Sequence, residues 1–201
     1  MSTVRLSKAA LSEQAAQLKV YRAALPSLDL KRRQLMLETA RQKLAQQDLI
    51  AAIKANAETV GTHLPLLADT PLDLDGLVTL KTVTLRHENI VGVILPTLDA
   101  IEVEVAPYSF MVLPHWVDSY VAIMRERLEL EQRYRISHQR LDTLARALTK
   151  ITQRVNLFQN VLIPRTLEAL RRIRIALADI ERAAVVRSKL AKKKQRQGRG
   201  E

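Results

Sequence analysis

The side chains most able to bind a metal ion or to move a proton are few in this sequence, and they lie far apart. Its four histidines are His63, His87, His115 and His138. No two of them have the spacing of an HExxH zinc site, in which two imidazoles share one face of a helix. We therefore interpret the histidines as surface residues and predict no metal site.

Two pairs of carboxylates outside the predicted long helices are candidates, but neither has the setting of a catalytic acid and base. Asp73 and Asp75 lie in a stretch rich in proline and glycine, and Glu102 and Glu104 lie in an extended one. Two catalytic carboxyls need an apolar pocket that separates their pKa values, and the flanking sequence offers none. The sequence also has no cysteine, no GxxxxGK[ST] phosphate loop and no GxSxG motif. We therefore predict a non-catalytic protein without a cofactor.

The residues that do recur with a regular spacing are apolar. Between Ser137 and Ile163 they alternate in steps of three and four, at Leu141, Leu144, Leu148, Ile151, Val155, Phe158 and Leu162. This spacing predicts the seam of a helix that packs against a second helix as a coiled coil. The repeat resumes after Pro164, so we expect a kink or a change of register there within one helix over residues 115–192.

A first long helix is predicted within residues 1–60, starting near Ser12. Its apolar residues are Leu11, Ala15, Leu18, Leu25, Leu28, Leu35, Leu37, Ile50, Ile53, Ala57 and Val60. Pro26 could mark a kink or the start of a new helix, and we favour a kink because the spacing continues across it. Residues 61–114 are interrupted by glycine and proline, which excludes a long helix.

Within that connecting region, alternating apolar residues predict a β-hairpin over about residues 80–95, with its turn at His87–Asn89. Residues 101–105 could form a third extended segment. Two long helices around a small connecting region must run antiparallel to bury both seams. The predicted fold is therefore all-α: a long antiparallel two-helix coiled coil, or helical hairpin, with a small β-hairpin insertion in the connecting region.

The net charge of +11 is concentrated at the C-terminal end, where eight basic and no acidic residues lie between Arg182 and Arg199. We predict a disordered basic tail over residues 193–201. Such a segment can bind nucleic acid or anionic lipid, or can be a solvated end. The absence of cysteine and of a long apolar run leads us to expect a cytoplasmic protein.

Two segments resemble the D subunit of the V-type (vacuolar and archaeal-type) ATPases and ATP synthases. Residues 154–164, RVNLFQNVLIP, resemble the RVNxLExVxIP segment of that family. Residues 89–96, NIVGVILP, resemble its hairpin strand. The chain departs from the family pattern at Phe158 and Gln159, where leucine and glutamate are usual, and at Pro26.

The resemblance implies a central rotor shaft, or central stalk, of a proton- or ion-transporting ATPase or ATP synthase. Such a shaft would transmit torque between the A3B3 catalytic ring and the membrane rotor ring, associated peripherally with the membrane. The implied partners are the F subunit, the catalytic A and B subunits, and the d or C subunit of the membrane rotor. The resemblance implies neither a small-molecule substrate nor nucleic acid as a partner.

Two surfaces are candidates for these partners. We expect the A3B3 ring to meet a set of long basic side chains, namely Arg146, Lys150, Arg154, Arg171, Arg172 and Arg174. On the hairpin, apolar residues expected to be exposed suggest a second contact, namely Val83, Leu85, Val91 and Val93. The alternative function is a coiled-coil adaptor that binds nucleic acid or an anionic membrane through its basic tail.

Overall fold

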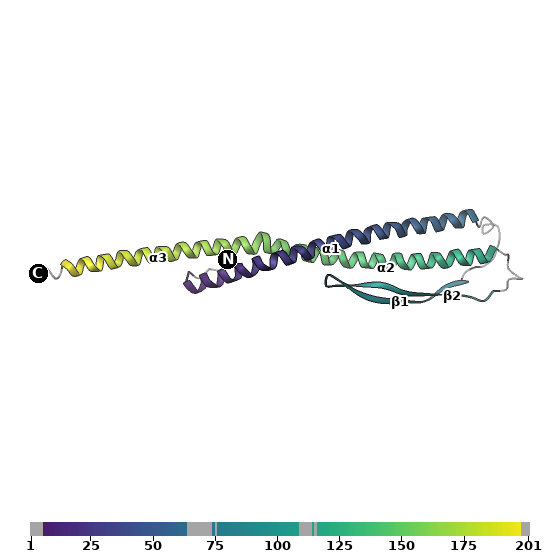
Figure 1. Ribbon diagram of the computed structural model, residues 1–201, viewed down its shortest axis with the longest axis horizontal. Coiled ribbons are helices and arrows are strands. Elements are labelled where there is room, and N and C mark those ends of the chain that lie inside the picture. Colours follow the sequence, from purple (N-terminus) through teal and green to yellow (C-terminus); the bar gives the residue numbers. More distant parts are fainter. Residues whose placement is uncertain (1–5, 64–73, 75, 109–113, 115, 198–201) are drawn as a thin grey trace. The chain divides into compact units, whose positions relative to one another are not determined.

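The computed structural model describes residues 6–63, 74, 76–108, 114 and 116–197 (Figure 1). The chain is mostly helical, with one two-stranded antiparallel sheet. Its elements are α1 (Lys8–His63), β1 (Val78–Ile90), β2 (Val93–Val105), α2 (Trp116–Asn156), the π-helical segment η2 (Leu157–Leu162) and α3 (Ile163–Gln197). Within the described part, none of the helices combines the length and the apolar character that a membrane-spanning helix needs.

The chain divides into two compact units, which are described separately. The central unit is Arg32–Lys150, and the terminal unit joins Met1–Lys31 to Ile151–Glu201. These units are defined by which residues pack together. The four segments expected from the sequence are instead defined by their secondary structure. Each unit contains part of α1 and part of the helical stretch that starts with α2.

Helix α1 is longer than the sequence indicated, beginning at Lys8 instead of near Ser12. The hydroxyl of Ser7 accepts a hydrogen bond from the amide of Ala10 at 3.2 Å, which is the interaction of an N-cap residue. The helix continues through Pro26 as one element, so no new helix starts there. After this proline, the Ser27 hydroxyl donates to the Ala24 carbonyl at 2.8 Å.

In the central unit, α1 and α2 run side by side and antiparallel (Figure 1). Arg127 donates to the carbonyl of Ile53 at 3.3 Å, and the side-chain amide of Asn56 donates to the carbonyl of Ile123 at 3.4 Å. A step forward along α1 is therefore a step backward along α2. Leu35 of α1 and Leu144 of α2 are both almost completely buried in this unit.

The buried face of α1 differs from the apolar stripe expected from the sequence. Leu37 is 63% exposed and Ala57 is also exposed, whereas Asn56 is only 6% exposed. The other residues of this inward face that are half-buried include Gln42, Gln46, Leu49 and Ile53. Polar residues therefore occupy part of the buried face of α1. Leu37 and Ala57, which were expected on that face from their apolar spacing, are exposed to solvent instead.

The hairpin is longer than expected, and its turn lies elsewhere. Ile90 pairs with Val93, so Val91 and Gly92 form a two-residue turn, with φ values of 54° and 76°. Positive φ at both positions is the geometry of a type I′ turn, whose twist suits a hairpin. The predicted turn at His87–Asn89 is wrong, because these residues belong to β1. Residues 101–105 are the end of β2 and not a third strand.

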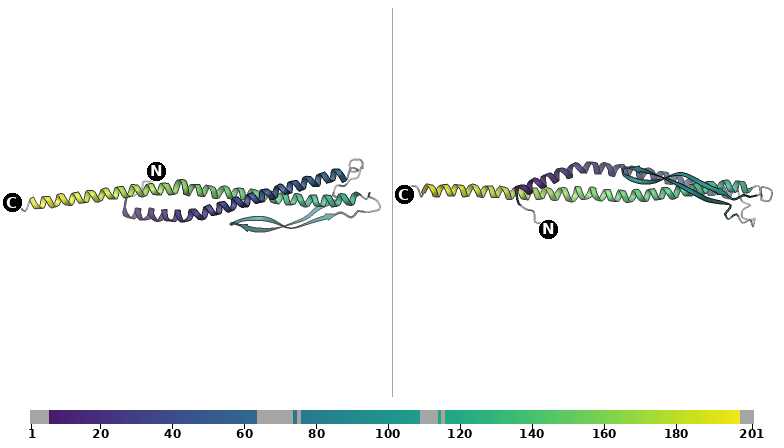
Figure 2. Two further views of the ribbon diagram at one scale, coloured as in Figure 1. Left: turned by 45° about the horizontal axis from the view of Figure 1, so that its top comes forward. Right: turned by 90° about the horizontal axis from the view of Figure 1, so that it is seen from below.

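Two irregularities in pairing interrupt the hairpin. Register shifts between Leu80 and Thr82 and between Thr84 and Leu85 leave Lys81 and Asp99 without a partner in the ladder. Such bulges increase the local right-handed twist. The two strands accordingly coil about each other (Figure 2).

A small apolar cluster lies where the hairpin and α2 begin. Trp116 and Val117 are buried there, against Val60 and Tyr108 among others. The Tyr108 hydroxyl donates to the Asp118 carboxylate at 2.6 Å. This hydrogen bond, together with burial and the charge of Asp118, raises the pKa of Tyr108.

In the terminal unit, the helical path changes its hydrogen-bond spacing just before Pro164. The amide of Ile163 donates to the carbonyl of Phe158, five residues earlier, and α3 continues from Ile163. A proline in an α-helix lacks the amide donor and presses on the carbonyl four residues back. The wider π turn of η2 relieves that contact and shifts the register, so the predicted change of register at Pro164 is confirmed.

Candidate partner-binding surfaces

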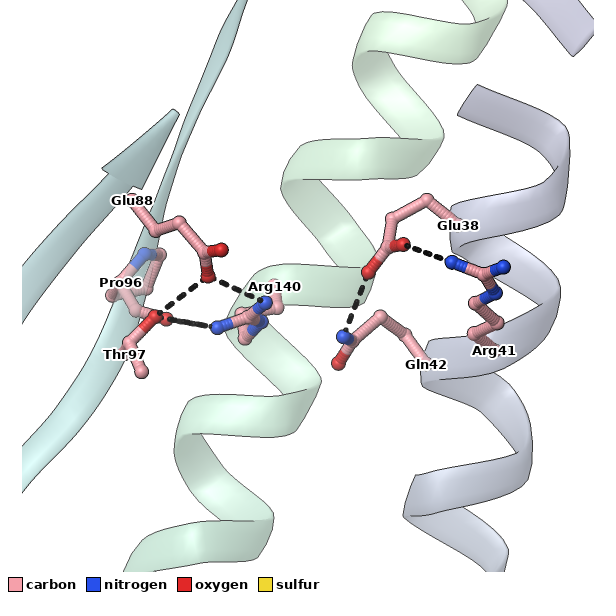
Figure 3. A network of polar contacts seen from close by, with 7 residues as sticks. All are labelled: Glu38, Arg41, Gln42, Glu88, Pro96, Thr97 and Arg140. Atoms are coloured by element: carbon pink, nitrogen blue, oxygen red, sulfur yellow. Dashed lines mark hydrogen bonds and ion pairs between the residues drawn. The ribbon is translucent and has the colours of Figure 1, made fainter. Parts of the chain in front are cut away.

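Arg140 of α2 joins the helix to the distal half of the hairpin (Figure 3). Its guanidinium donates to the Thr97 hydroxyl at 2.6 Å and to the Pro96 carbonyl at 3.2 Å. Glu88, on the other strand, lies 3.6 Å from the same guanidinium. The Arg140 side chain is only 11% exposed, whereas that of Glu88 is 55% exposed, so the bonds to Thr97 and Pro96 are better shielded from water than the ion pair.

The network fixes which face of the distal hairpin can meet a partner. Glu88 is paired across the ladder with Leu95, which is completely buried. This face of the hairpin therefore packs against the rest of the central unit. The opposite face carries the pairs Asn89 with Ile94 and Leu85 with Leu98.

The hairpin residues proposed for partner contact are only partly accessible. Leu85 is 41% exposed, whereas Val83, Val91 and Val93 are half-buried. Ile94 is 64% exposed and was not selected from the sequence. Ile94 and Leu95 are both apolar, so the sequence does not show which of them is buried; side chains alternate between faces along a strand, which exposes Ile94 beside the buried Leu95.

The six basic residues proposed for the catalytic ring are all exposed. Arg146 and Lys150 belong to the central unit, and the other four belong to the terminal unit. Arg172 pairs with Glu168 on its own helix. The others form no ion pair with any residue that the structure describes, which leaves their charges available.

The seven apolar residues proposed for the seam are all buried or half-buried. Leu144 lies in the central unit at 0% exposure, and Ile151 and Val155 lie in the terminal unit at 5% and 1%. Leu141, Leu148, Phe158 and Leu162 are half-buried. Phe158 contacts Tyr21 of α1 edge-to-face, with ring centroids 5.5 Å apart.

Helix α3 has a different surface beyond Ile173. Thr166, Ala169, Leu170 and Ile173 are buried within the terminal unit, whereas Leu167 is 42% exposed. Every described side chain from Glu181 to Lys194 is exposed, including Val185 and Val186. The helix continues to Gln197, so it includes part of the tail that was expected to be disordered.

The histidines and the paired carboxylates are not brought together. His87 and His138 are exposed, and Nε2 of His138 lies 4.0 Å from Asp142. Glu102 and Glu104 are exposed on β2. His115, Asp73, Asp75 and the His63 side chain lie outside the described residues. Among the residues that are described, no group of three or more His, Asp or Glu side chains could hold a metal ion.

Paired antiparallel helices and a docked two-stranded hairpin define a mostly helical protein with separate exposed basic and apolar surfaces. The chain belongs to the ATP synthase D subunit family, whose model matches residues 10–193.

Relatives of this family match along nearly the whole chain. The V-type ATP synthase D subunit of Borreliella burgdorferi is 32% identical over 199 residues, covering 96% of this chain and 95% of the relative. The protein of the same name from Chlamydia abortus is 30% identical over 203 residues, covering 100% and 97%. That of Chlamydia muridarum is 28% identical over 196 residues, covering 96% of each.

Proposed function

We propose that this chain is the central rotor shaft of a V-type ion-translocating ATPase or ATP synthase. It would carry torque between an A3B3 catalytic ring and a membrane rotor ring, bind no nucleotide and associate with the membrane only through the complex. Family membership and the names of the relatives support its place in such a complex. The observation that carries the mechanical role is the antiparallel pairing of α1 with α2 in the central unit.

A shaft must resist twisting, and two paired helices do so better than one. Each helix is a rod of backbone hydrogen bonds, and side-chain contacts between the rods stop them from sliding. In the central unit, the bonds of Arg127 to Ile53 and of Asn56 to Ile123 add directional contacts to the apolar seam. Within the terminal unit, we propose that Ile151, Val155 and Phe158 form the corresponding apolar seam against α1.

A shaft that turns within a ring needs surfaces that hold weakly in several orientations. Long basic side chains exposed to water can pair with acidic groups and release them at small cost, since exposed ion pairs contribute about 0–1 kcal/mol each. Arg146, Lys150, Arg154, Arg171, Arg172 and Arg174 are such side chains. We propose that they face the catalytic A and B subunits. The exposed side of the hairpin is proposed to face the F subunit, and the connecting region is proposed to face the d or C subunit.

The experiment that tests the function is purification of the tagged full-length chain from its own cells. A rotor shaft should bring down a small F-like subunit and a six-membered ATPase ring in fixed stoichiometry. Binding of the purified chain to DNA or anionic liposomes without any such complex would instead identify the adaptor function.

The torque role is tested by charge neutralisation in the assembled complex. Changing Arg146, Lys150 and Arg154 to glutamine should lower ATP-driven rotational torque severalfold without loss of helicity. The matched control changes Arg125, Arg133 and Arg135, which are exposed and lie on the same helix α2. Equal torque in both triple variants would contradict the proposed ring contact.

A further inference from the structure

The face of α1 that points away from α2 carries large apolar side chains in water. Leu37 and Leu44 are each 63% exposed, and Met36 is 53% exposed. Ala40 and Ala51 are exposed beside them. All five belong to the central unit, and they are here called the outer stripe.

The spacing of the outer stripe shows that it is one continuous surface. Leu37, Leu44 and Ala51 follow each other at intervals of seven residues, and Met36, Ala40 and Leu44 at intervals of four. Both intervals bring side chains onto the same face of an α-helix. At ~100° per residue, Leu44 lies about 180° around the helix from Leu35, which is almost completely buried.

Single exposed leucines are common on protein surfaces, but contiguous ones are not. The outward face of a helix paired on one side ordinarily carries charged and polar residues. Here α1 has apolar side chains on two opposite faces, of which α2 covers one. A helix with two apolar faces can pack against two neighbours, one on each face.

The charges around the outer stripe indicate the chemistry of the second neighbour. Four exposed basic residues lie between positions 33 and 54, namely Arg33, Arg41, Lys43 and Lys54. The exposed acidic residue in this interval is Asp48, and Glu38 is half-buried and lies 3.9 Å from Arg41. A second copy of this chain would bring positive charge against positive charge, and its net charge of +11 adds to that repulsion.

We propose that the outer stripe is the docking site for an amphipathic helix of another protein of the complex, whose apolar face is bordered by Asp and Glu. The partner's apolar side chains would cover Leu37 and Leu44, and its carboxylates would pair with Arg41, Lys43 and Lys54. This inference rests on the proposed function, because it requires that the chain work within a complex of several different proteins.

The absence of native cysteine allows a direct test of the docking site. Leu44→Cys places a single thiol on the outer stripe, and Ala45→Cys places one at an exposed neighbour about 100° away around the helix. Alkylation by a maleimide is measured for the full chain alone and for the purified complex. Assembly should slow alkylation of the thiol at position 44 at least tenfold and of the thiol at position 45 less than twofold.

A benzophenone maleimide on the thiol at position 44 identifies the occupant. Mass spectrometry of the crosslinked peptide should give a segment with apolar residues three and four apart and a net negative charge. A crosslink between two copies of this chain, or to a basic or non-helical segment, would overturn the proposal. So would unchanged alkylation at position 44 in a complex that contains the ATPase ring, and this result would leave the proposed function intact. Failure of any ring to co-purify would instead remove the proposed function, and this docking site with it.

Discussion

The guanidinium of Arg140 on α2 lies 2.6 Å from the hydroxyl of Thr97 on β2 and is almost completely shielded from water. An isolated two-stranded hairpin is marginally stable in water. The contact therefore explains how this hairpin keeps a defined position, because it ties β2 to a long helix. Its partner Glu88 adds a tie to β1.

Replacing Arg140 by methionine should release the distal hairpin. The change keeps an unbranched side chain but removes the hydrogen bonds that Arg140 donates to Thr97 and Pro96, which should lower the free energy of unfolding by about 1–3 kcal/mol. Amide hydrogen exchange in residues 86–98 should rise at least tenfold. Arg133→Met is the control, because the Arg133 side chain is 54% exposed and forms an ion pair with Glu129 on its own helix. Similar exchange in both variants would show that the network does not hold the hairpin.

Replacing Val91 by asparagine should stabilise the hairpin. Val91 has a φ of 54°, where a β-branched side chain is strained and asparagine is tolerated. We expect the free energy of unfolding to rise by about 1 kcal/mol, measured by urea denaturation. Val93→Asn, at a half-buried ladder position with negative φ, should lower it. A loss of stability with Val91→Asn would mean that the valine side chain makes contacts that outweigh its strain.

The two helical prolines should respond differently to replacement by alanine. Pro26 lies in a continuous α-helix, so Pro26→Ala restores a backbone hydrogen bond and should raise the free energy of unfolding by about 1–3 kcal/mol. Pro164 follows the π turn of η2, which already accommodates its ring. Pro164→Ala should therefore gain less than half as much. Both changes loosen the unfolded chain similarly, so the difference reports on the folded state. A larger gain at Pro164 would contradict the role given to η2.

Asp118 should control the ionisation of Tyr108. The pKa of Tyr108 is raised in the folded chain, first of all by its hydrogen bond to Asp118. The stability that this bond contributes is thus present below the ordinary tyrosine pKa of about 10 and is lost as pH rises through the raised value. Asp118→Asn should move the pKa of Tyr108 back toward its ordinary value in a carbon-13 NMR titration. Asp142→Asn, at an exposed carboxylate elsewhere on α2, should not.

The features that sequence reasoning could predict are those with strong local periodicity. Leu144, Ile151 and Val155 recur at coiled-coil spacing, and all three are buried. Pro164 interrupts that spacing, and the register shift lies next to it. Long helices are read reliably in this way because each turn repeats the same signal.

The features that were missed depend on contacts between distant segments. Asn56 is buried because Ile123 and Glu126 offer its amide two acceptors, and nothing near it in the sequence indicates this. The hairpin turn was misplaced because valine is a poor residue for position 91, so the tertiary pairing of Ile90 with Val93 overrides local preference. Nothing in the local sequence distinguishes Arg140 from the other arginines of α2, because its burial results from the packing of the hairpin against it.

The exposed end of α3 has a consequence for the chain before it finds its partners. Ile180, Val185, Val186 and Leu190 are each more than half exposed, and a lone helix without tertiary contacts is only marginally stable in water. The newly made chain should thus unravel at this end first, where cellular proteases cut most readily. Under the proposed function, assembly into the complex would cover these residues, so unassembled chains would be degraded faster than incorporated ones.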